Sequence, residues 1–136
     1  MKNALLIVMI SILGILIFGC KKNDSSNPIS STDLIVKQWK LVGLVNISDQ
    51  QKYLNAVLEI KSNNNYIHTD NAGVICSQGI WKIESDYLIL ASTLFGNGAE
   101  PKYKILKLDS DTLKLQQHYT LDSKDSYLEY HYISKF

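Results

Sequence analysis

The chain has 136 residues, and its 14 lysines, 13 acidic residues and lack of arginine give a formal net charge of +1. This length corresponds to one domain. The balanced charge and the missing guanidinium groups argue against binding of nucleic acids or nucleotides, which proteins recognise largely through phosphate.

The chain begins with an apolar segment that stops at a cysteine. Lys2 precedes an apolar run of about 15 residues, Ala4 to Phe18, and Cys20 is followed by two lysines. This run is shorter than the roughly 20 residues that a membrane-spanning helix needs. An ordinary cleaved signal peptide has small residues in an A-x-A-like pattern before the cut. No such pattern is present here.

The end of this segment resembles the lipobox of bacterial lipoproteins. Leu16-Ile17-Phe18-Gly19-Cys20 has a branched aliphatic residue, a small residue before the cut and a cysteine to receive the lipid. The resemblance implies that residues 1–19 are a signal peptide and that Cys20 carries acyl chains such as palmitate. Two or three chains anchor a protein stably, at about 0.8 kcal/mol per buried methylene. The alternative is a short membrane anchor with an incidental cysteine.

Residues 20–33 combine the lipidated cysteine with a polar stretch. The sequence of residues 21–33, KKNDSSNPISSTD, contains many serines and asparagines and almost no apolar side chains. Such a composition cannot bury a core, so it predicts a flexible tether. The folded domain is therefore expected over residues 34–136.

The domain consists of short runs in which apolar and polar residues alternate, separated by turn-forming residues. The runs cover residues 38–47, 56–61, 66–70, 79–84, 87–91, 102–108, 112–120 and 126–136. A period of two predicts β-strands, and so many short strands predict an antiparallel meander, closed as a barrel or folded as a sandwich. Short helical turns are expected within residues 31–39 and 47–55.

The alternation also predicts which side chains share a face. In the first strand, one face contains Trp39, Leu41, Gly43, Val45 and Ile47. In the strand over residues 102–108, Leu106 and Leu108 share a face. A two-residue hairpin at Ser85-Asp86 is expected to bring Leu88 beside Trp81. The Trp81 ring N–H needs a partner, which favours a position near one end of the barrel.

The order of these segments resembles the small lipocalin-like domains of exported bacterial lipoproteins. The segments that carry the resemblance are LIVKQWKLVGL (34–44), LEIKSNNNYI (58–67), GIWKIESDYLIL (79–90) and KYKILKLDSDTLKLQ (102–116). Unlike true lipocalins, the first strand lacks a glycine two residues before its tryptophan. The resemblance implies an all-β, antiparallel up-and-down barrel of about eight short strands. It also implies a monomer, anchored by lipid to the outer membrane or cell surface rather than the inner membrane.

The expected function is binding of a small apolar or amphipathic ligand in the barrel mouth. The candidate ligand-binding residues are those expected to face inward: Trp39, Leu58, Ile60, Trp81, Leu88 and Leu115. A connected apolar pocket above about 300 Å³ would suit such a site. A filled interior, which strands of about six residues favour, would indicate an interaction module that docks to an envelope protein or glycan through outer tyrosines.

We expect no enzymatic activity, no cofactor and no metal site. The histidines are His68, His118 and His131. Glu129 and His131 have ligand spacing, but a metal needs more converging ligands, so a polar outer face is expected there. Motifs typical of nucleophilic catalysis are missing from the sequence. Cys76 is expected to be a buried small hydrophobe rather than a reactive thiol.

Overall fold

The computed structural model describes residues 31–94 and 100–135. The predicted signal peptide, Cys20 and most of the tether lie outside the described residues. The elements are α2 (Ser31–Ile35), β1 (Gln38–Val45), η1 (Gln50–Lys52), β2 (Val57–Ile60), β3 (Asn65–Thr69), β4 (Ile75–Glu84), β5 (Tyr87–Ser92), β6 (Lys102–Leu108), β7 (Thr112–Leu121) and β8 (Lys124–Ser134). Both expected helical turns are present as α2 and η1. In the part of the chain that the structure describes, neither helix is long and apolar enough to cross a membrane.

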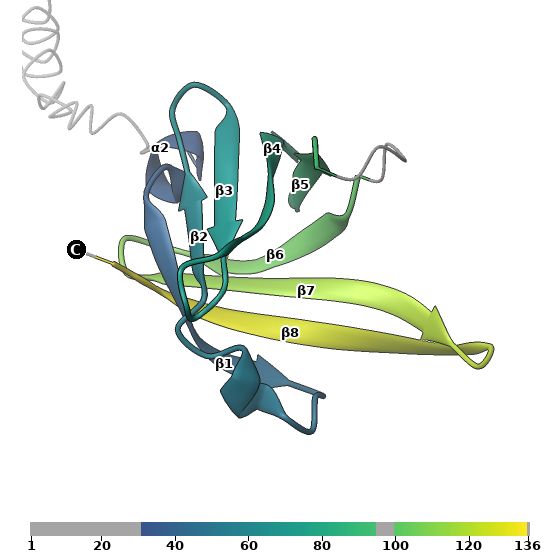
Figure 1. The fold of residues 1–136 in the computed structure, drawn as a ribbon. Coiled ribbons are helices and arrows are strands. Elements are labelled where there is room, and N and C mark those ends of the chain that lie inside the picture. Colours follow the sequence, from purple (N-terminus) through teal and green to yellow (C-terminus); the bar gives the residue numbers. More distant parts are fainter. Residues whose placement is uncertain (1–30, 95–99, 136) are drawn as a thin grey trace, which may run out of the picture.

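The strands form one closed barrel. Each strand pairs antiparallel with the next, and β1 also pairs with β8, so the described strands form an eight-stranded up-and-down barrel (Figure 1). This confirms the predicted all-β fold class. The hairpin between β4 and β5 is as predicted, because Glu84 pairs with Tyr87 and leaves Ser85 and Asp86 as the turn. Ser85 adopts a positive φ of 55°.

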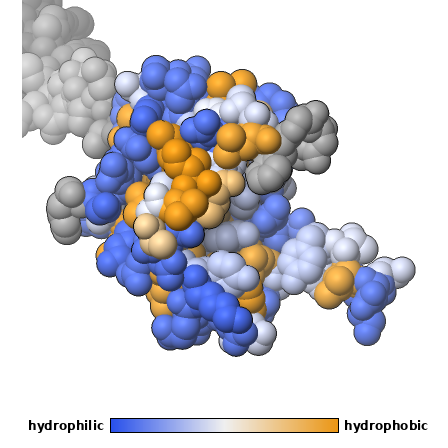
Figure 2. Space-filling model, in the orientation of Figure 1, coloured by the Kyte–Doolittle hydropathy of each residue, from blue (hydrophilic) through white to orange (hydrophobic). Residues whose placement is uncertain are grey.

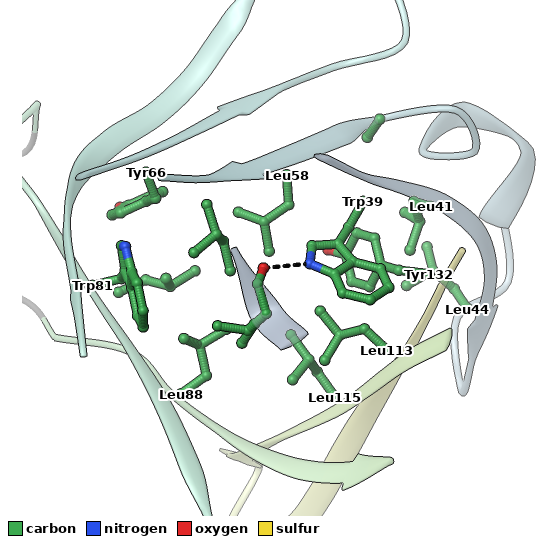
Figure 3. Packing of buried hydrophobic residues seen from close by; sticks show 14 residues of the cluster. Trp39, Leu41, Leu44, Leu58, Tyr66, Trp81, Leu88, Leu113, Leu115 and Tyr132 are labelled. Carbon is green, nitrogen blue, oxygen red and sulfur yellow. Dashed lines mark hydrogen bonds between the residues drawn. The ribbon is translucent and has the colours of Figure 1, made fainter. Parts of the chain in front are cut away.

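Apolar side chains fill the interior in one cluster (Figure 3). Its members are Ile35, Trp39, Leu41, Leu44, Ala56, Leu58, Ile60, Tyr66, Trp81, Leu88, Leu90, Leu113, Leu115 and Tyr132. Helix α2 closes one end of the barrel, where the Trp39 indole N–H donates a 2.8 Å hydrogen bond to the Ile35 carbonyl. We call this the closed end.

Two β-bulges change the faces that the alternation predicted. In β1 the pairing with β8 shifts between Leu41 and Gly43, so Leu44 lies in the core and Val45 is 37% exposed. In β6 the shift falls between Ile105 and Lys107, which leaves Leu106 exposed while Leu108 packs against the core. The predicted faces beyond Leu41 and around Leu106 are therefore wrong. A bulge inserts one residue, and one residue exchanges the two faces of a strand.

Gly79 permits a close approach of β4 and β5. A Cβ at this position would lie 1.9 Å from the carbonyl oxygen of Ala91. The residue pairs with Ser92, in the same ladder in which Trp81 pairs with Leu90. No residue with a side chain fits this backbone geometry without a shift of β5.

Strands β7 and β8 continue past the barrel as a two-stranded ribbon (Figure 1). Pairing of β6 with β7 ends at Gln116, and pairing of β1 with β8 ends at Glu129, whereas β7 and β8 pair up to their turn. Among the described strands, none flanks the outer part of this ribbon, residues 117–128. Tyr119, Leu121 and Tyr127 are exposed there. The surface of the projecting ribbon combines hydrophobic, intermediate and hydrophilic residues (Figure 2).

Candidate functional site

All six predicted ligand-binding residues are buried in the core. Their exposed fractions are at most 5%: Trp39 0%, Leu58 2%, Ile60 1%, Trp81 5%, Leu88 0% and Leu115 1%. Their predicted inward orientation is therefore correct, and all six belong to the single hydrophobic cluster of the interior (Figure 3). The indole N–H of Trp81 donates a 2.8 Å hydrogen bond to the Lys61 carbonyl in the β2–β3 turn, which supplies the partner that the sequence required.

An apolar pocket of about 270 Å³ lies at the other end of the barrel, opposite α2. We call it the mouth pocket. Its lining residues are Leu41, Leu44, Ile47, Tyr53, Ala56, His68, Leu128, Tyr130 and Tyr132. They come from the end of β1, the segment around η1, the end of β3 and the middle of β8 (Figure 1). None of the six predicted ligand-binding residues is in this lining.

Other hollows suit a small apolar ligand less well. Two of about 330 Å³ have several amide and charged side chains in their lining, for example Gln38, Glu59 and Lys135 in one of them. A third, of about 300 Å³, lies beside Trp81 and includes Lys82 and Glu100. Sites for small organic ligands are mostly apolar with few polar groups. The mouth pocket is the hollow with that composition.

The bulge in β1 and the segment after it build the mouth pocket. The bulge turns Leu44 inward, and the Leu44 amide donates to the Gln50 side-chain carbonyl at 3.4 Å. The chain then turns at Asn46 and Asn55, which both have a positive φ, as asparagine tolerates. Two hydrogen bonds of 2.8 Å return the segment to Leu41. The Asn55 amide donates to the Leu41 carbonyl, and the Leu41 amide donates to the Ala56 carbonyl.

Tyrosine rings form one wall of the pocket. The rings of Tyr130 and Tyr132 lie nearly parallel with centroids 6.3 Å apart, and Tyr103 meets Tyr130 edge-on at 5.7 Å. The Tyr130 hydroxyl donates to the Gln117 side-chain carbonyl at 3.1 Å. Burial raises the pKa of Tyr132 and of Tyr103, so both phenols are neutral at physiological pH.

His68 is the imidazole in the pocket lining. It lies in β3 between Leu58 of β2 and Ser77 of β4. Its Nε2 atom is buried and has no hydrogen-bond partner among the described residues. Burial lowers the pKa of His68 from its usual 6.5, with the Asp70 carboxylate opposing this shift, so the ring is neutral at pH 7.

Sequence reasoning did not place His68 in a site, although a signal was present. Tyr66 and His68 are two residues apart in a predicted strand, and such residues share a face. Tyr66 is buried, and its hydroxyl lies 2.7 Å from the Ser77 hydroxyl, so the same face of β3 points inward at both positions. A polar residue on an inward face marks a candidate site.

The remaining histidines lie outside the pocket. The Nε2 atom of His131 pairs with the Glu129 carboxylate. The Nε2 atom of His118 lies 3.0 Å from the Gln116 side-chain carbonyl oxygen, and the His118 ring lies beside the Tyr127 ring. Within residues 31–94 and 100–135, no group of three His, Cys, Asp or Glu residues is arranged to hold a metal ion.

Cys76 is exposed, so the prediction of a buried small hydrophobe is wrong. The physical reason is its place in β4. Trp81 is buried and the Ser77 hydroxyl meets that of buried Tyr66, so the odd-numbered positions of this strand face inward and Cys76 faces outward. A third bulge also leaves Cys76 without an opposite residue, because His68 pairs with Ser77 and Thr69 pairs with Ile75.

No protein-family model matches this chain, and no curated protein matches its sequence. A barrel fold serves many functions, so function has to be inferred from the chemistry of the site.

Proposed function

We propose that this chain is a lipid-anchored lipoprotein of a bacterial cell envelope whose lipocalin-like barrel binds a small apolar or amphipathic ligand. The observation that supports this most strongly is the mouth pocket. Apolar and aromatic side chains supply all of its lining except His68. Its volume of about 270 Å³ lies slightly below the roughly 300 Å³ expected from the sequence for such a site, so the ligand in this proposal is small.

In this proposal the ligand contacts the mouth residues, and the six buried residues predicted from the sequence serve as the rigid support beneath them. The barrel acts by binding and not by catalysis, and it acts as a monomer. Leu41 and Tyr132 belong both to the core cluster and to the pocket lining. A packed core therefore holds two walls of the pocket in place, which lowers the entropic cost of binding.

The anchor in this proposal is the lipid on Cys20, inferred from the lipobox resemblance. The tether of residues 21–33 runs into α2, which lies at the closed end of the barrel. An attachment there leaves the mouth pocket at the far end from the anchored terminus. The mouth is then open to ligands in the surrounding compartment.

Native mass spectrometry of the protein purified from its own cells tests ligand binding. We expect a co-purifying small molecule on the wild type, and its loss from Ala56→Leu, which fills part of the pocket. Val42→Leu is the matched control, because Val42 is exposed on the outer face of β1. If no molecule is bound to the wild type, or if both variants retain it equally, the mouth is not the ligand site.

Replacement of Cys20 tests the anchor. Cys20→Ala should lose metabolic labelling with a palmitate analogue and leave the membrane fraction, because a single lipidated cysteine supplies all the acyl chains. Cys76→Ala is the matched control and should remain labelled and membrane-bound. If Cys20→Ala stays in the membrane at high salt, residues 1–19 are an uncleaved anchor.

A second candidate function is docking to an envelope protein or glycan, and both the filled interior and the ribbon favour it. Tyr119, Leu121 and Tyr127 are 41%, 59% and 39% exposed on a segment that no described strand flanks. A triple serine variant of these residues should keep mouth-ligand binding. It should lose cross-links to any envelope component that the wild type forms in cells. Unchanged cross-links would remove this candidate.

A further inference from the structure

The imidazole of His68 is a polar group within an otherwise apolar and aromatic pocket. Its buried Nε2 has no hydrogen-bond partner among the described residues. A buried polar atom without a partner costs about 1–3 kcal/mol, so a ligand group that pairs with it gains that energy.

We infer that the mouth pocket takes a small, neutral ring compound bearing one hydroxyl group, and that this hydroxyl pairs with the imidazole of His68. The inference rests on the proposed ligand-binding function and specifies the class of ligand.

The lining argues for a neutral ligand. Among the described residues that line the pocket, none is a lysine, aspartate or glutamate, and the Tyr132 phenol is held neutral by burial. A carboxylate or ammonium group on the ligand would lose its hydration and find no fixed opposite charge. The cost of burying an unpaired charge exceeds what one hydrogen bond returns.

A hydroxyl is the neutral group that suits an imidazole in either of its tautomers. A neutral imidazole has one N–H donor and one nitrogen acceptor, and a hydroxyl both donates and accepts. Nε2 has almost no exposed surface, so the His68 ring must turn for it to meet a ligand. The turn is about the torsion between a tetrahedral carbon and a planar ring, which has a broad energy minimum.

The walls argue for a ring. Tyr130 and Tyr132 present nearly parallel rings on one side of the pocket, and Tyr53 adds a third ring from the η1 side. Aromatic pairs in offset or edge-on arrangements are favourable by about 0.5–1.5 kcal/mol beyond the area that they bury. A pocket of about 270 Å³ has room for one substituted ring, since apolar cavities of about 150 Å³ hold benzene.

A comparison of two probes that differ by one hydroxyl tests this inference. The probes are para-cresol and toluene, titrated by NMR into the lipid-free chain of residues 21–136. We expect wild type to bind para-cresol about tenfold more tightly than toluene, the factor that one hydrogen bond to a buried partner provides. His68→Leu should reduce this preference to about twofold while still binding toluene. His118→Leu, which replaces an exposed histidine, should keep the wild-type preference.

Several outcomes would overturn the inference. One is equal affinity of wild type for the two probes, and another is an unchanged preference in His68→Leu. Tighter binding of para-toluate than of para-cresol would overturn the neutral class. If wild type binds toluene in these cases, the proposed ligand-binding function is still supported. If wild type binds none of the probes, both proposals are wrong. If His68→Leu does not fold, His68→Met provides the same comparison with a more adaptable side chain.

Discussion

The two ends of the barrel use their aromatic residues differently. At the closed end, Trp39 and Trp81 direct their indole N–H groups to main-chain carbonyls, those of Ile35 and Lys61, each at 2.8 Å. At the mouth, the His68 Nε2 has no partner among the described residues. The indole N–H groups of the closed end therefore find partners within the fold, whereas one imidazole nitrogen at the mouth does not.

The backbone that forms the two ends differs in the same sense. A five-residue helix and the start of β1 cover the closed end, with Ile35 and Trp39 both 0% exposed. A bulge and a segment with two positive-φ asparagines cover the mouth, where Tyr53 is 48% exposed. Segments with few buried apolar contacts open at low cost in free energy. The comparison predicts that stability is concentrated at the closed end and binding at the mouth.

Trp39→Ala should have the largest effect on stability. Removing this fully buried ring leaves a large cavity and an unpaired Ile35 carbonyl, so we expect a loss of about 3–5 kcal/mol in the free energy of unfolding. Urea unfolding measures it. Trp39→Phe refills much of the space without the N–H and should lose less, and Trp81→Ala should resemble Trp39→Ala. A loss below about 1 kcal/mol for Trp39→Ala would contradict a closed end that carries the stability.

Gly79→Ala should come next. Its Cβ would lie 1.9 Å from the Ala91 carbonyl oxygen, so β4 and β5 must separate, at a cost of about 1–3 kcal/mol or more. Gly43→Ala is the matched control. The nearest atom to a Cβ at position 43 would be the Cβ of His131, at an ordinary contact distance of 3.6 Å. Thermal unfolding of both variants measures the difference. Equal melting temperatures of the two variants would show that β4 and β5 can separate at Gly79 without loss of stability.

The fold could be predicted from the sequence because period-two patterns and turn residues agree along the chain. The strand over 102–108 matches β6 residue for residue, and Ser85-Asp86 forms the expected hairpin. The inward positions of Trp39, Leu58 and Leu115 follow from the same pattern. The position of a strand and the side chains that it turns inward depend on local sequence, which determines them well where strand pairing has no bulge.

The site could not be predicted in the same way, because bulges determine it. Leu44 lines the pocket through the bulge in β1, and Leu106 is exposed through the bulge in β6. A bulge depends on how two strands pair, and the sequence of one strand does not contain that information. His68 is the exception, since strict alternation from Tyr66 would have placed it inside.

Acid should weaken the fold through His68. Burial lowers its pKa below the usual 6.5, so the unfolded chain takes up a proton near pH 6.5 that the folded chain does not. The free energy of unfolding should therefore fall as the pH is lowered from 7.5 through 6.5, and this loss should end below the folded pKa. Urea unfolding at pH 7.5, 6.5 and 5.5 measures the slope.

Two variants assign that slope to the mouth. His68→Leu removes the titrating ring and should flatten the dependence between pH 7.5 and 5.5. His118→Gln alters an exposed histidine on the ribbon and should leave the dependence as in wild type. A slope that persists in His68→Leu would mean that burial of the neutral His68 imidazole does not cause it, and the two ends would then not differ in their electrostatics.

Tyr53→Ala should have the smallest effect on stability and a measurable effect on binding. Tyr53 is 48% exposed beyond η1, and substitutions at such positions usually change stability by less than about 0.5 kcal/mol. Its ring lines the pocket, so para-cresol should bind about threefold to tenfold more weakly, the value of one aromatic contact. Tyr87→Ala, at an exposed tyrosine of β5 that is absent from the pocket lining, should change neither quantity. If Tyr53→Ala instead destabilises the barrel as much as Trp39→Ala, the mouth carries as much stability as the closed end. If para-cresol affinity is unchanged, the segment around η1 is a cover and not a wall of the site.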